Sequence, residues 1–214
     1  MDAIAKLVGA GVSLGGQPVL AGIDLHLAPG RSLGISGPNG SGKTTLVRAL
    51  ATLITFDTGS ATVLGVDVQH ADLTGVRREI GLIGHQPSLL PELTLAENLE
   101  HVARLSGIDA GRVSYALDVV GLDDAADRRA AVCSFGMRRR VEIAHFLLVK
   151  PRLLLLDEAA SGLDDAAQEL IGALLGSVRE RDGAAVMVSH DRNHLAEHCD
   201  KLFTLASGHL VGTP

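Results

Sequence analysis

The sequence predicts an α/β protein in which helices cover a mainly parallel central sheet on both faces. From residue 32 onward, short wholly apolar segments alternate with helical ones, as in a buried parallel sheet. Residues 1–30 instead alternate apolar and polar side chains, which predicts an N-terminal antiparallel β subdomain. Strands are missing between about residues 87 and 135, which predicts an inserted helical subdomain there.

Local signals place the individual elements. The dipeptides Gly15-Gly16 and Pro29-Gly30 predict turns in the N-terminal subdomain. The predicted sheet strands are Leu33–Ser36, Ile80–Gly84, Leu153–Leu156, Ala185–Ser189 and Lys201–Leu205. The predicted helices are Thr45–Leu53, Leu95–Leu105, Val113–Val120 and Met137–Leu148. We therefore expect residues 1–214 to form a single domain with one insertion.

Composition argues against nucleic acid as a partner. The formal net charge is −6, the sequence pI is about 5.8 and aromatic residues make up only 2% of the chain. An acidic surface repels phosphate backbones, and unpaired bases need aromatic side chains on which to stack. The densest basic cluster, Arg138–Arg140, lies on a predicted helix, where we expect its side chains to fan out and be solvated.

No segment has the pattern of a membrane span or a secretory signal. The longest apolar run surrounds Leu153–Leu156 and is far shorter than the about 20 residues that cross a bilayer. The N-terminus lacks a basic segment followed by an apolar one. Two cysteines, Cys133 and Cys199, do not suggest a disulfide framework. We expect a cytoplasmic location and no direct insertion into lipid.

The most informative segment is a glycine-rich loop of the kind that binds phosphate. Residues 37–45 have the spacing Gly-x-x-x-x-Gly-Lys-Thr and lie between a predicted strand and a predicted helix. Glycines let backbone N–H groups surround a phosphate at the N-terminus of the following helix. Lys43 would neutralise the β- and γ-phosphates, and the Thr44 hydroxyl would ligate Mg²⁺. The expected nucleotide contacts are Gly37, Pro38, Asn39, Gly40, Ser41, Gly42, Lys43, Thr44 and Thr45.

Two carboxylates follow the apolar strand Leu153–Leu156. Asp157 comes directly after this strand and Glu158 is the next residue. The carboxyl ends of parallel strands form the ligand-binding edge of such sheets, and an Asp there organises Mg²⁺ in nucleotide-hydrolysing enzymes. Glu158 would polarise the attacking water. An acidic turn after a strand is common without any function, but its combination with the phosphate-binding loop favours a site of nucleotide hydrolysis.

These segments, together with four others in the same order, resemble the ATP-binding subunits of ABC transporters over nearly the whole chain. Residues 37–45 resemble the Walker A loop of that family, and Leu153–Glu158 the Walker B strand with its catalytic carboxylate. The other matches are Gln86 to the Q-loop glutamine, Cys133–Arg140 to the signature motif, Ser161–Asp164 to the D-loop and Ser189–Asp191 to the switch-histidine segment. The resemblance implies the P-loop NTPase fold of an ABC ATPase.

The resemblance also implies an ATPase that works as a dimer. Two subunits, identical or paralogous, would pair head to tail, with ATP between the Walker A loop of one and the signature motif of the other. The signature residues expected to act in this way are Ser134, Phe135, Gly136 and Met137, at a helix N-terminus that favours phosphate. Asp164 would be the D-loop aspartate.

Catalytic and metal-binding roles follow from the same resemblance. Lys43, Glu158 and His190 would be the catalytic residues, with His190 contacting the γ-phosphate. Gln86 would join Thr44 and Asp157 as a ligand of Mg²⁺. The implied small molecules are therefore ATP and Mg²⁺.

The implied partner is an integral membrane permease, with this chain held peripherally on the inner face of the cell membrane. The short length of this chain and its segments Gly84–Pro87 and Leu93–Leu99 are similar to those of the ATP-binding subunit of the haem exporter of cytochrome c maturation. They also resemble other small export ATPases. A soluble ABC ATPase that serves iron–sulfur assembly is a further alternative. A binding-only regulatory subunit is disfavoured, because it would have no need of Glu158 and His190.

The chain departs from the family pattern at two places that concern the site. Cys133 and Phe135 stand where the signature motif usually has leucine and glycine, while Gly136 is kept. Many relatives also stack the adenine on an aromatic residue near the N-terminus, where this chain has Leu14. We expect the base to pack on Leu14 or Val12, with weak discrimination between ATP and GTP.

A histidine repeat near the C-terminus has a spacing that also occurs in metal sites on helices. His190, His194 and His198 are four residues apart, and Cys199 follows the last of them. Because His190 is assigned to the nucleotide, we interpret His194 and His198 as residues of a helix surface. Cys133 and Cys199 are interpreted as small buried residues.

Overall fold

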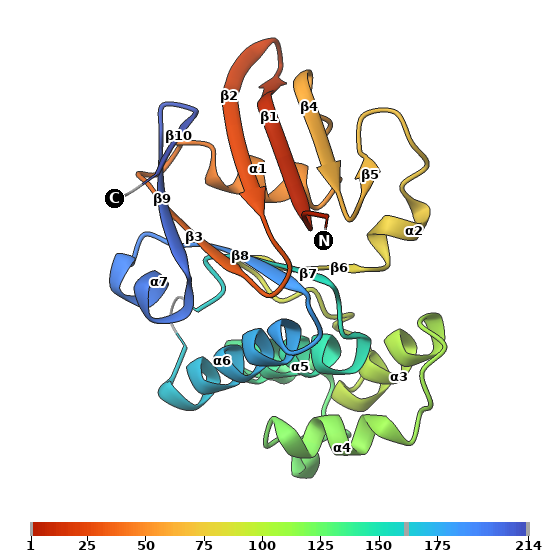
Figure 1. Ribbon diagram of the computed structural model, residues 1–214. Helices are drawn as coiled ribbons and strands as arrows, with labels where there is room; N and C mark the ends of the chain where they lie inside the picture. Colours follow the sequence, from red (N-terminus) through yellow and green to blue (C-terminus); the bar gives the residue numbers. More distant parts are fainter. Residues whose placement is uncertain (1, 161–162, 213–214) are drawn as a thin grey trace. The chain divides into compact units, whose positions relative to one another are not determined.

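The computed structural model describes residues 2–160 and 163–212, and the chain divides into two compact units. The first unit comprises Met1–Leu82, Pro151–Ala159 and Val178–Pro214 and contains both sheets (Figure 1). The second unit comprises Ile83–Lys150 and Ala160–Ser177 and is helical. Each has its own hydrophobic core. Among the described residues, no helix is long and apolar enough to span a bilayer.

The first unit begins with an antiparallel sheet, as predicted. Its strands are β1 Ala5–Leu14, β2 Gln17–Leu27, β4 Thr58–Val63 and β5 Val66–Asp67, in the order β2–β1–β4–β5. Leu25 and Leu27 of β2 are buried, whereas His26 between them is exposed, which is the alternation that predicted the strand. The pattern did not predict β4, because its residues Thr58–Ser60 are polar or glycine.

The second sheet of this unit carries the predicted parallel core. Its strands are β3 Ser32–Ser36, β6 Ile80–Ile83, β7 Leu153–Asp157, β8 Ala184–Val188, β9 Lys201–Ala206 and β10 His209–Gly212, in the order β10–β9–β3–β8–β7–β6. Strand β3 pairs in parallel with β8 and β9, and β7 pairs in parallel with β8. Every residue of β3, β7 and β8 is buried, as wholly apolar runs require. Strand β10, which was not predicted, pairs antiparallel with β9.

In the described part of the first unit, the helices are α1 Lys43–Leu50, α2 Thr74–Arg77 and α7 Arg192–His198. Helix α1 contacts β2 of one sheet and β7 and β8 of the other, so it lies between the two sheets (Figure 1). It ends before the predicted Leu53, because Thr52 has a left-handed backbone with φ of 61°. Leu53 is therefore 62% exposed. Helix α7 contacts β3 and β9.

The second unit packs helices around a separate core. They are α3 Leu95–Leu105, α4 Arg112–Val119, the 3₁₀ turns η1 Asp123–Ala125 and η2 Ala130–Val132, α5 Phe135–Val149 and most of α6 Asp165–Arg179. Helix α3 has the predicted bounds because Thr94 and Glu97 form a capping box at its start. The unit contains the predicted insert, residues 87–135, and also all of α5.

Candidate nucleotide-binding site

The glycine-rich loop connects β3 to α1, and two of its glycines lie where no side chain fits. A Cβ atom on Gly37, whose φ is 156°, would lie 2.2 Å from the carbonyl oxygen of Leu205. One on Gly42, at φ 103°, would lie 2.8 Å from a methyl group of Leu20. Glycine is therefore required at both positions by close approach as well as by backbone conformation. The tight curve of the loop therefore depends on these two glycines.

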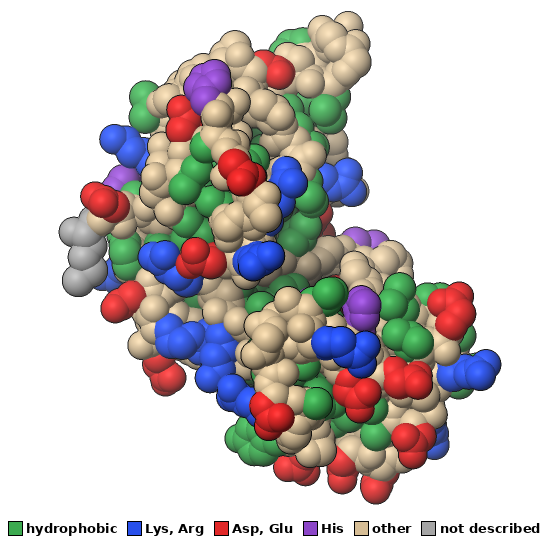
Figure 2. All heavy atoms as spheres, turned by 90° about the vertical axis from the view of Figure 1, so that its right-hand side faces the viewer, with side chains coloured by type: hydrophobic (Ala, Val, Ile, Leu, Met, Phe, Trp, Pro, Cys, Tyr) green, Lys and Arg blue, Asp and Glu red, His purple; other side chains and the backbone are tan. Residues whose placement is uncertain are grey.

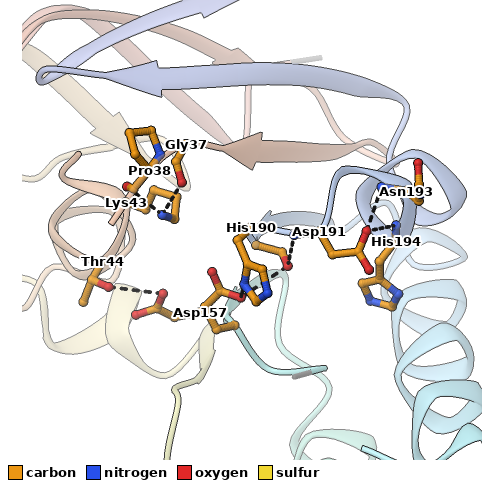
Figure 3. Close-up of polar contacts among 11 residues, drawn as sticks. Gly37, Pro38, Lys43, Thr44, Asp157, His190, Asp191, Asn193 and His194 are labelled. Atoms are coloured by element: carbon orange, nitrogen blue, oxygen red, sulfur yellow. Dashed lines mark hydrogen bonds and ion pairs between the residues drawn. The ribbon is translucent and has the colours of Figure 1, made fainter. Parts of the chain in front are cut away.

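Lys43 and Thr44 begin α1 and turn polar atoms toward the loop and the adjacent strand (Figure 3). The Lys43 ammonium is buried and donates hydrogen bonds to the carbonyl oxygens of Gly37 at 2.7 Å and Pro38 at 3.1 Å. The Thr44 hydroxyl donates to Asp157 Oδ1 at 3.3 Å, where Asp157 ends β7. A hydroxyl and a carboxylate at this distance are oxygen donors of the kind that Mg²⁺ prefers.

Glu158, next to Asp157, has a backbone conformation that is costly for its residue type. Its φ is 53°, in the left-handed region, and its N–H donates to the carbonyl oxygen of Val188 at 3.0 Å. Its carboxylate Oε2 accepts a hydrogen bond from the Ser189 hydroxyl at 3.3 Å and lies 3.0 Å from His190 Nδ1. The Glu158 side chain is 19% exposed and that of His190 is 68% exposed. The strained turn thus aims a carboxylate at the edge of the sheet, with an open imidazole beside it.

A cavity of about 240 Å³ lies against these residues. Its lining residues are Val19, Asn39, Gly40, Gly42, Lys43, Thr44, Thr45, Asp157 and Glu158. Sequence reasoning did not find Val19, because an apolar residue on an N-terminal strand carries no signal of its own. The other eight were all predicted to contact nucleotide, to bind metal or to act in catalysis.

The two residues proposed for the base contact differ in exposure. Leu14, at the end of β1, is 45% exposed, whereas Val12 is 1% exposed and belongs to the core. A buried side chain has no free face on which a base can pack, so the structure excludes Val12. Leu14 stays a prediction.

The signature segment forms the start of α5 in the helical unit. Ser134 is the N-cap of this helix, and its Oγ accepts a hydrogen bond from the Met137 N–H at 3.2 Å. The helix therefore begins at Phe135, two residues before the predicted start at Met137, and includes Gly136. Cys133 is buried as predicted, and its thiol donates to the carbonyl oxygen of Arg129 at 3.3 Å. Cys199 of the first unit is half-buried.

The middle arginine of Arg138–Arg140 is buried, contrary to the prediction of a solvated cluster. The Arg139 side chain is 1% exposed and forms an ion pair with Glu142, which is 3% exposed. It also donates hydrogen bonds to the carbonyl oxygens of Gly84 at 2.8 Å and His85 at 2.9 Å. Its guanidinium carbon lies 5.4 Å from the centre of the Phe135 ring.

Glu142, the partner of Arg139, contacts the backbone that follows Gln86, whereas Arg139 contacts the backbone that precedes it. Its carboxylate accepts a hydrogen bond from the Ser88 N–H at 3.2 Å. Burial raises the pKa of Glu142 and the nearby Arg139 opposes that rise, while burial lowers the pKa of Arg139. One buried ion pair on α5 therefore holds the backbone on both sides of Gln86. Sequence reasoning missed this pair, because Arg and Glu three residues apart on a helix are usually exposed.

The aspartate at the end of the D-loop is also paired. Asp164 Oδ1 accepts a hydrogen bond from the Ala167 N–H at 2.8 Å, and both Asp164 oxygens accept hydrogen bonds from Arg140 at 2.9 and 3.2 Å. The Ala167 N–H and then Arg140 hold the pKa of Asp164 below its usual value. Ser161 and Gly162 lie outside the described residues.

Charges are mixed on the face of the molecule that Figure 2 shows. Blue Lys and Arg side chains and red Asp and Glu side chains both occur there. This agrees with the net charge of −6.

The fold and the site define a nucleoside-triphosphate-hydrolysing protein. A phosphate-binding loop, a strand-end aspartate and a neighbouring glutamate at the carboxyl edge of a parallel sheet are the parts that such enzymes use. The family model described as ABC transporter matches residues 20–161. The chain belongs to the ABC transporter family, and it is an ATP-binding ATPase domain of that family.

Curated relatives agree with this assignment. The chain is 34% identical over 217 residues to the ABC transporter ATP-binding protein SCO3161 of Streptomyces coelicolor, covering 97% of this chain and 82% of the relative. It is 36% identical over 193 residues to the cytochrome c biogenesis ATP-binding export protein CcmA 2 of Cupriavidus metallidurans, covering 89% and 91%. A Nod factor export ATP-binding protein I of Rhizobium etli is 33% identical over 201 residues, with 92% and 63% covered. Relatives with different cargoes are thus about equally similar.

Solved structures share the fold. The dimeric ATP-binding cassette MJ0796, in a post-hydrolysis state with ADP and inorganic phosphate, superimposes with a TM-score of 0.85 at 27% identity, covering 97% of this chain and 98% of that one. CbiO1 of Clostridium perfringens, part of the ABC transporter complex CbiONQ, gives a TM-score of 0.83 at 24% identity, covering 99% and 88%. The predicted ABC ATPase fold is confirmed.

Proposed function

We propose that this chain is the ATP-hydrolysing subunit of an ABC transporter, which dimerises around two ATP molecules and drives a membrane permease. The observation that carries the proposal is the Glu158 carboxylate. It borders the cavity of the phosphate-binding loop and is held by Ser189 and His190. A module that only bound nucleotide would not need a carboxylate there.

The loop residues bind and neutralise the phosphates in this proposal. The Lys43 ammonium donates hydrogen bonds to two loop carbonyl oxygens. Its three N–H groups can turn from these oxygens to phosphate oxygens. Thr44 and Asp157 fit Mg²⁺, because their oxygen atoms already lie 3.3 Å apart at the cavity. When bound, Mg²⁺ would neutralise charge on the phosphates. Gln86 as a third ligand remains a proposal, because it belongs to the other unit.

Glu158 would orient the attacking water and accept its proton. A carboxylate with two fixed hydrogen-bond donors has one preferred orientation, and its second oxygen remains to face the water. A His190 imidazolium, with a proton on each ring nitrogen, would donate from Nδ1 to Glu158 and from Nε2 to the γ-phosphate. The histidine therefore couples the base to the phosphate.

Dimerisation would place the start of α5 on the nucleotide of the partner. Ser134 and the first N–H groups of α5 form a helix N-terminus, which favours a negatively charged phosphate. ADP lacks the γ-phosphate, so hydrolysis would loosen the dimer. The dimeric state named for MJ0796 supports this arrangement. The chain would then sit on the cytoplasmic face of the cell membrane, bound to the permease.

Two substitutions and a control test the enzyme. Glu158→Gln is expected to keep ATP binding, to abolish turnover and to accumulate as an ATP-bound dimer in size-exclusion chromatography. Lys43→Ala is expected to weaken ATP binding. Glu100→Gln, an exposed position on α3, is the matched control and should behave as the wild type. Turnover of Glu158→Gln near the wild-type rate would remove Glu158 from its role.

A pull-down separates a transporter subunit from an ATPase without a permease. Tagged Glu158→Gln protein is incubated with detergent-solubilised membranes of the source organism in the presence of ATP and Mg²⁺. Recovery of a polytopic membrane protein, absent when Lys43→Ala is the bait, supports the transporter. A dimer that captures no membrane protein favours an ATPase of the iron–sulfur assembly type.

Haem is the exported cargo that we favour. The CcmA 2 relative supports this choice, because the match covers 89% of this chain and 91% of the relative. Deleting the gene should then abolish covalent haem attachment to c-type cytochromes, while adding the wild-type gene back restores it. Normal cytochrome c in the deletion strain would assign this chain to another export system.

A further inference from the structure

Helix α7 brings together three side chains that have nothing to do with the nucleotide in the proposed mechanism. His194, Glu197 and His198 lie at positions i, i+3 and i+4 of this helix, so they share one face. One ligand atom from each lies within 4.8 Å of those of the others. His190 is not among them, since it precedes the helix, which Asp191 caps through the N–H groups of Asn193 and His194 (Figure 3).

The two imidazoles are packed against each other in a way that leaves one nitrogen without a partner. Their ring centres are 4.7 Å apart with the rings nearly edge to face. His194 Nε2 is buried and has no hydrogen-bond partner, one of the few side-chain atoms in the described part of the chain in that state. A buried nitrogen without a partner is costly, and a bound ion would remove that cost.

The three side chains differ in exposure. His194 and His198 are half-buried, so their rings are held by the surrounding structure. Glu197 is exposed and can rotate toward the pair.

We propose that His194, Glu197 and His198 form a binding site for a divalent cation of the zinc class on α7. Two imidazoles at i and i+4 and one carboxylate are a ligand set that Zn²⁺ accepts, with water as the fourth ligand. Zn–N and Zn–O bonds of about 2.1 Å place tetrahedral ligand atoms roughly 3.4 Å apart. The ligand atoms lie within 4.8 Å of one another, so the side chains must approach by up to about 1.4 Å. Imidazole ligands select against Mg²⁺, so the Mg²⁺ that accompanies ATP would not fill the site.

Calorimetric titration of the full chain with ZnCl₂ tests the proposal, in buffer that contains Mg²⁺ but no nucleotide. The wild type is expected to bind one Zn²⁺ per chain. His198→Ala and His194→Ala should each weaken that binding at least tenfold, and Glu197→Gln should weaken it less. His209→Ala, which removes an exposed histidine from β10 of the same unit, is the matched control and should bind as the wild type.

Two further variants separate this site from its neighbours. Equal loss of binding in His190→Ala would place the ion at the Glu158–His190 pair instead and overturn the proposal. Loss in Cys199→Ser would overturn the ligand set, because the thiol is no part of it. Wild-type affinity in His198→Ala would overturn the proposal outright. Co²⁺ gives an independent readout, since a tetrahedral N₂O₂ site produces visible absorption bands that His198→Ala should lack.

Discussion

Replacing Arg139 by methionine tests whether the buried ion pair with Glu142 holds the segment around Gln86 in place. Methionine keeps much of the apolar length of arginine, so the change removes mainly charge and hydrogen bonds. The carbonyl oxygens of Gly84 and His85 lose the guanidinium donor, and Glu142 is left without its cation. Glu142 keeps only the Ser88 N–H.

The expected cost follows from the burial of both partners, which are 1% and 3% exposed. Removing one member of such a pair leaves an uncompensated buried charge and costs about 3–5 kcal/mol of unfolding free energy. The double variant Arg139→Met/Glu142→Leu removes both charges, so we expect it to cost roughly 2 kcal/mol less than Arg139→Met. The orphaned carbonyls account for the remaining loss.

The cost of Arg139→Met should also depend on pH. Burial already raises the pKa of Glu142 against the opposing effect of Arg139, so without Arg139 the folded-state pKa rises further. When the pKa of a carboxyl is higher in the folded than in the unfolded state, the group destabilises the fold at any pH above the unfolded-state pKa. This destabilisation grows as the pH rises, until the pH reaches the folded-state pKa. The difference between Arg139→Met and wild type should therefore be smaller at pH 5 than at pH 8.

Urea unfolding followed by far-UV circular dichroism measures these differences, since the chain has no tryptophan for fluorescence. Hydrogen exchange supplies the local readout: the amides of residues 84–88 should lose protection in Arg139→Met. Exposed Arg152→Met, which breaks only the surface pair with Glu79, is the control and should cost less than about 1 kcal/mol. An Arg139→Met protein within 1 kcal/mol of wild type, with unchanged protection at 84–88, would refute the reasoning.

Three further predictions concern single positions. Gly37→Ala is expected to lose ATP binding in equilibrium titration and at least about 2 kcal/mol of stability, because its Cβ would meet the Leu205 carbonyl oxygen at 2.2 Å; wild-type ATP affinity would contradict this. Burial lowers the pKa of His145 to about 4 from 6.5, so the unfolded state takes up the proton first and stability present above pH 6.5 is lost as pH falls toward 4. His145→Phe should remove that loss, at most about 3 kcal/mol, in urea titrations at pH 7 and 4.5; an unchanged acid response would show that other groups cause it. With Leu14 as the only proposed base contact, ATP and GTP should compete about equally in ATPase assays, and a strong preference for adenine would disprove that contact.

Elements whose signals lie within a few neighbouring residues were predicted well. The wholly apolar runs became the fully buried strands β3, β7 and β8. Helix α3 has the predicted bounds because its capping residues, Thr94 and Glu97, are adjacent in sequence to the helix they cap. The cavity at the glycine-rich loop is lined by predicted residues for the same reason, since the loop and the strand ends carry short motifs.

Elements that depend on distant partners were missed or misjudged. Strand β10 is short, with His209 exposed, and exists because it pairs with β9. The exposure of Val12 could not be judged from β1 alone, because its burial comes from the core that the strand joins.

The sequence by itself determined that this protein binds and hydrolyses nucleotide, because a phosphate-binding loop and a strand-end carboxylate pair are local patterns with fixed spacing. Only the tertiary structure decided that the Arg139 side chain is buried. On the helix it resembles its exposed neighbours, but the carbonyl oxygen of Gly84 that it binds is 55 residues away along the chain. A charge can be buried only where partners compensate it, and partners from separate segments meet only after the chain has folded.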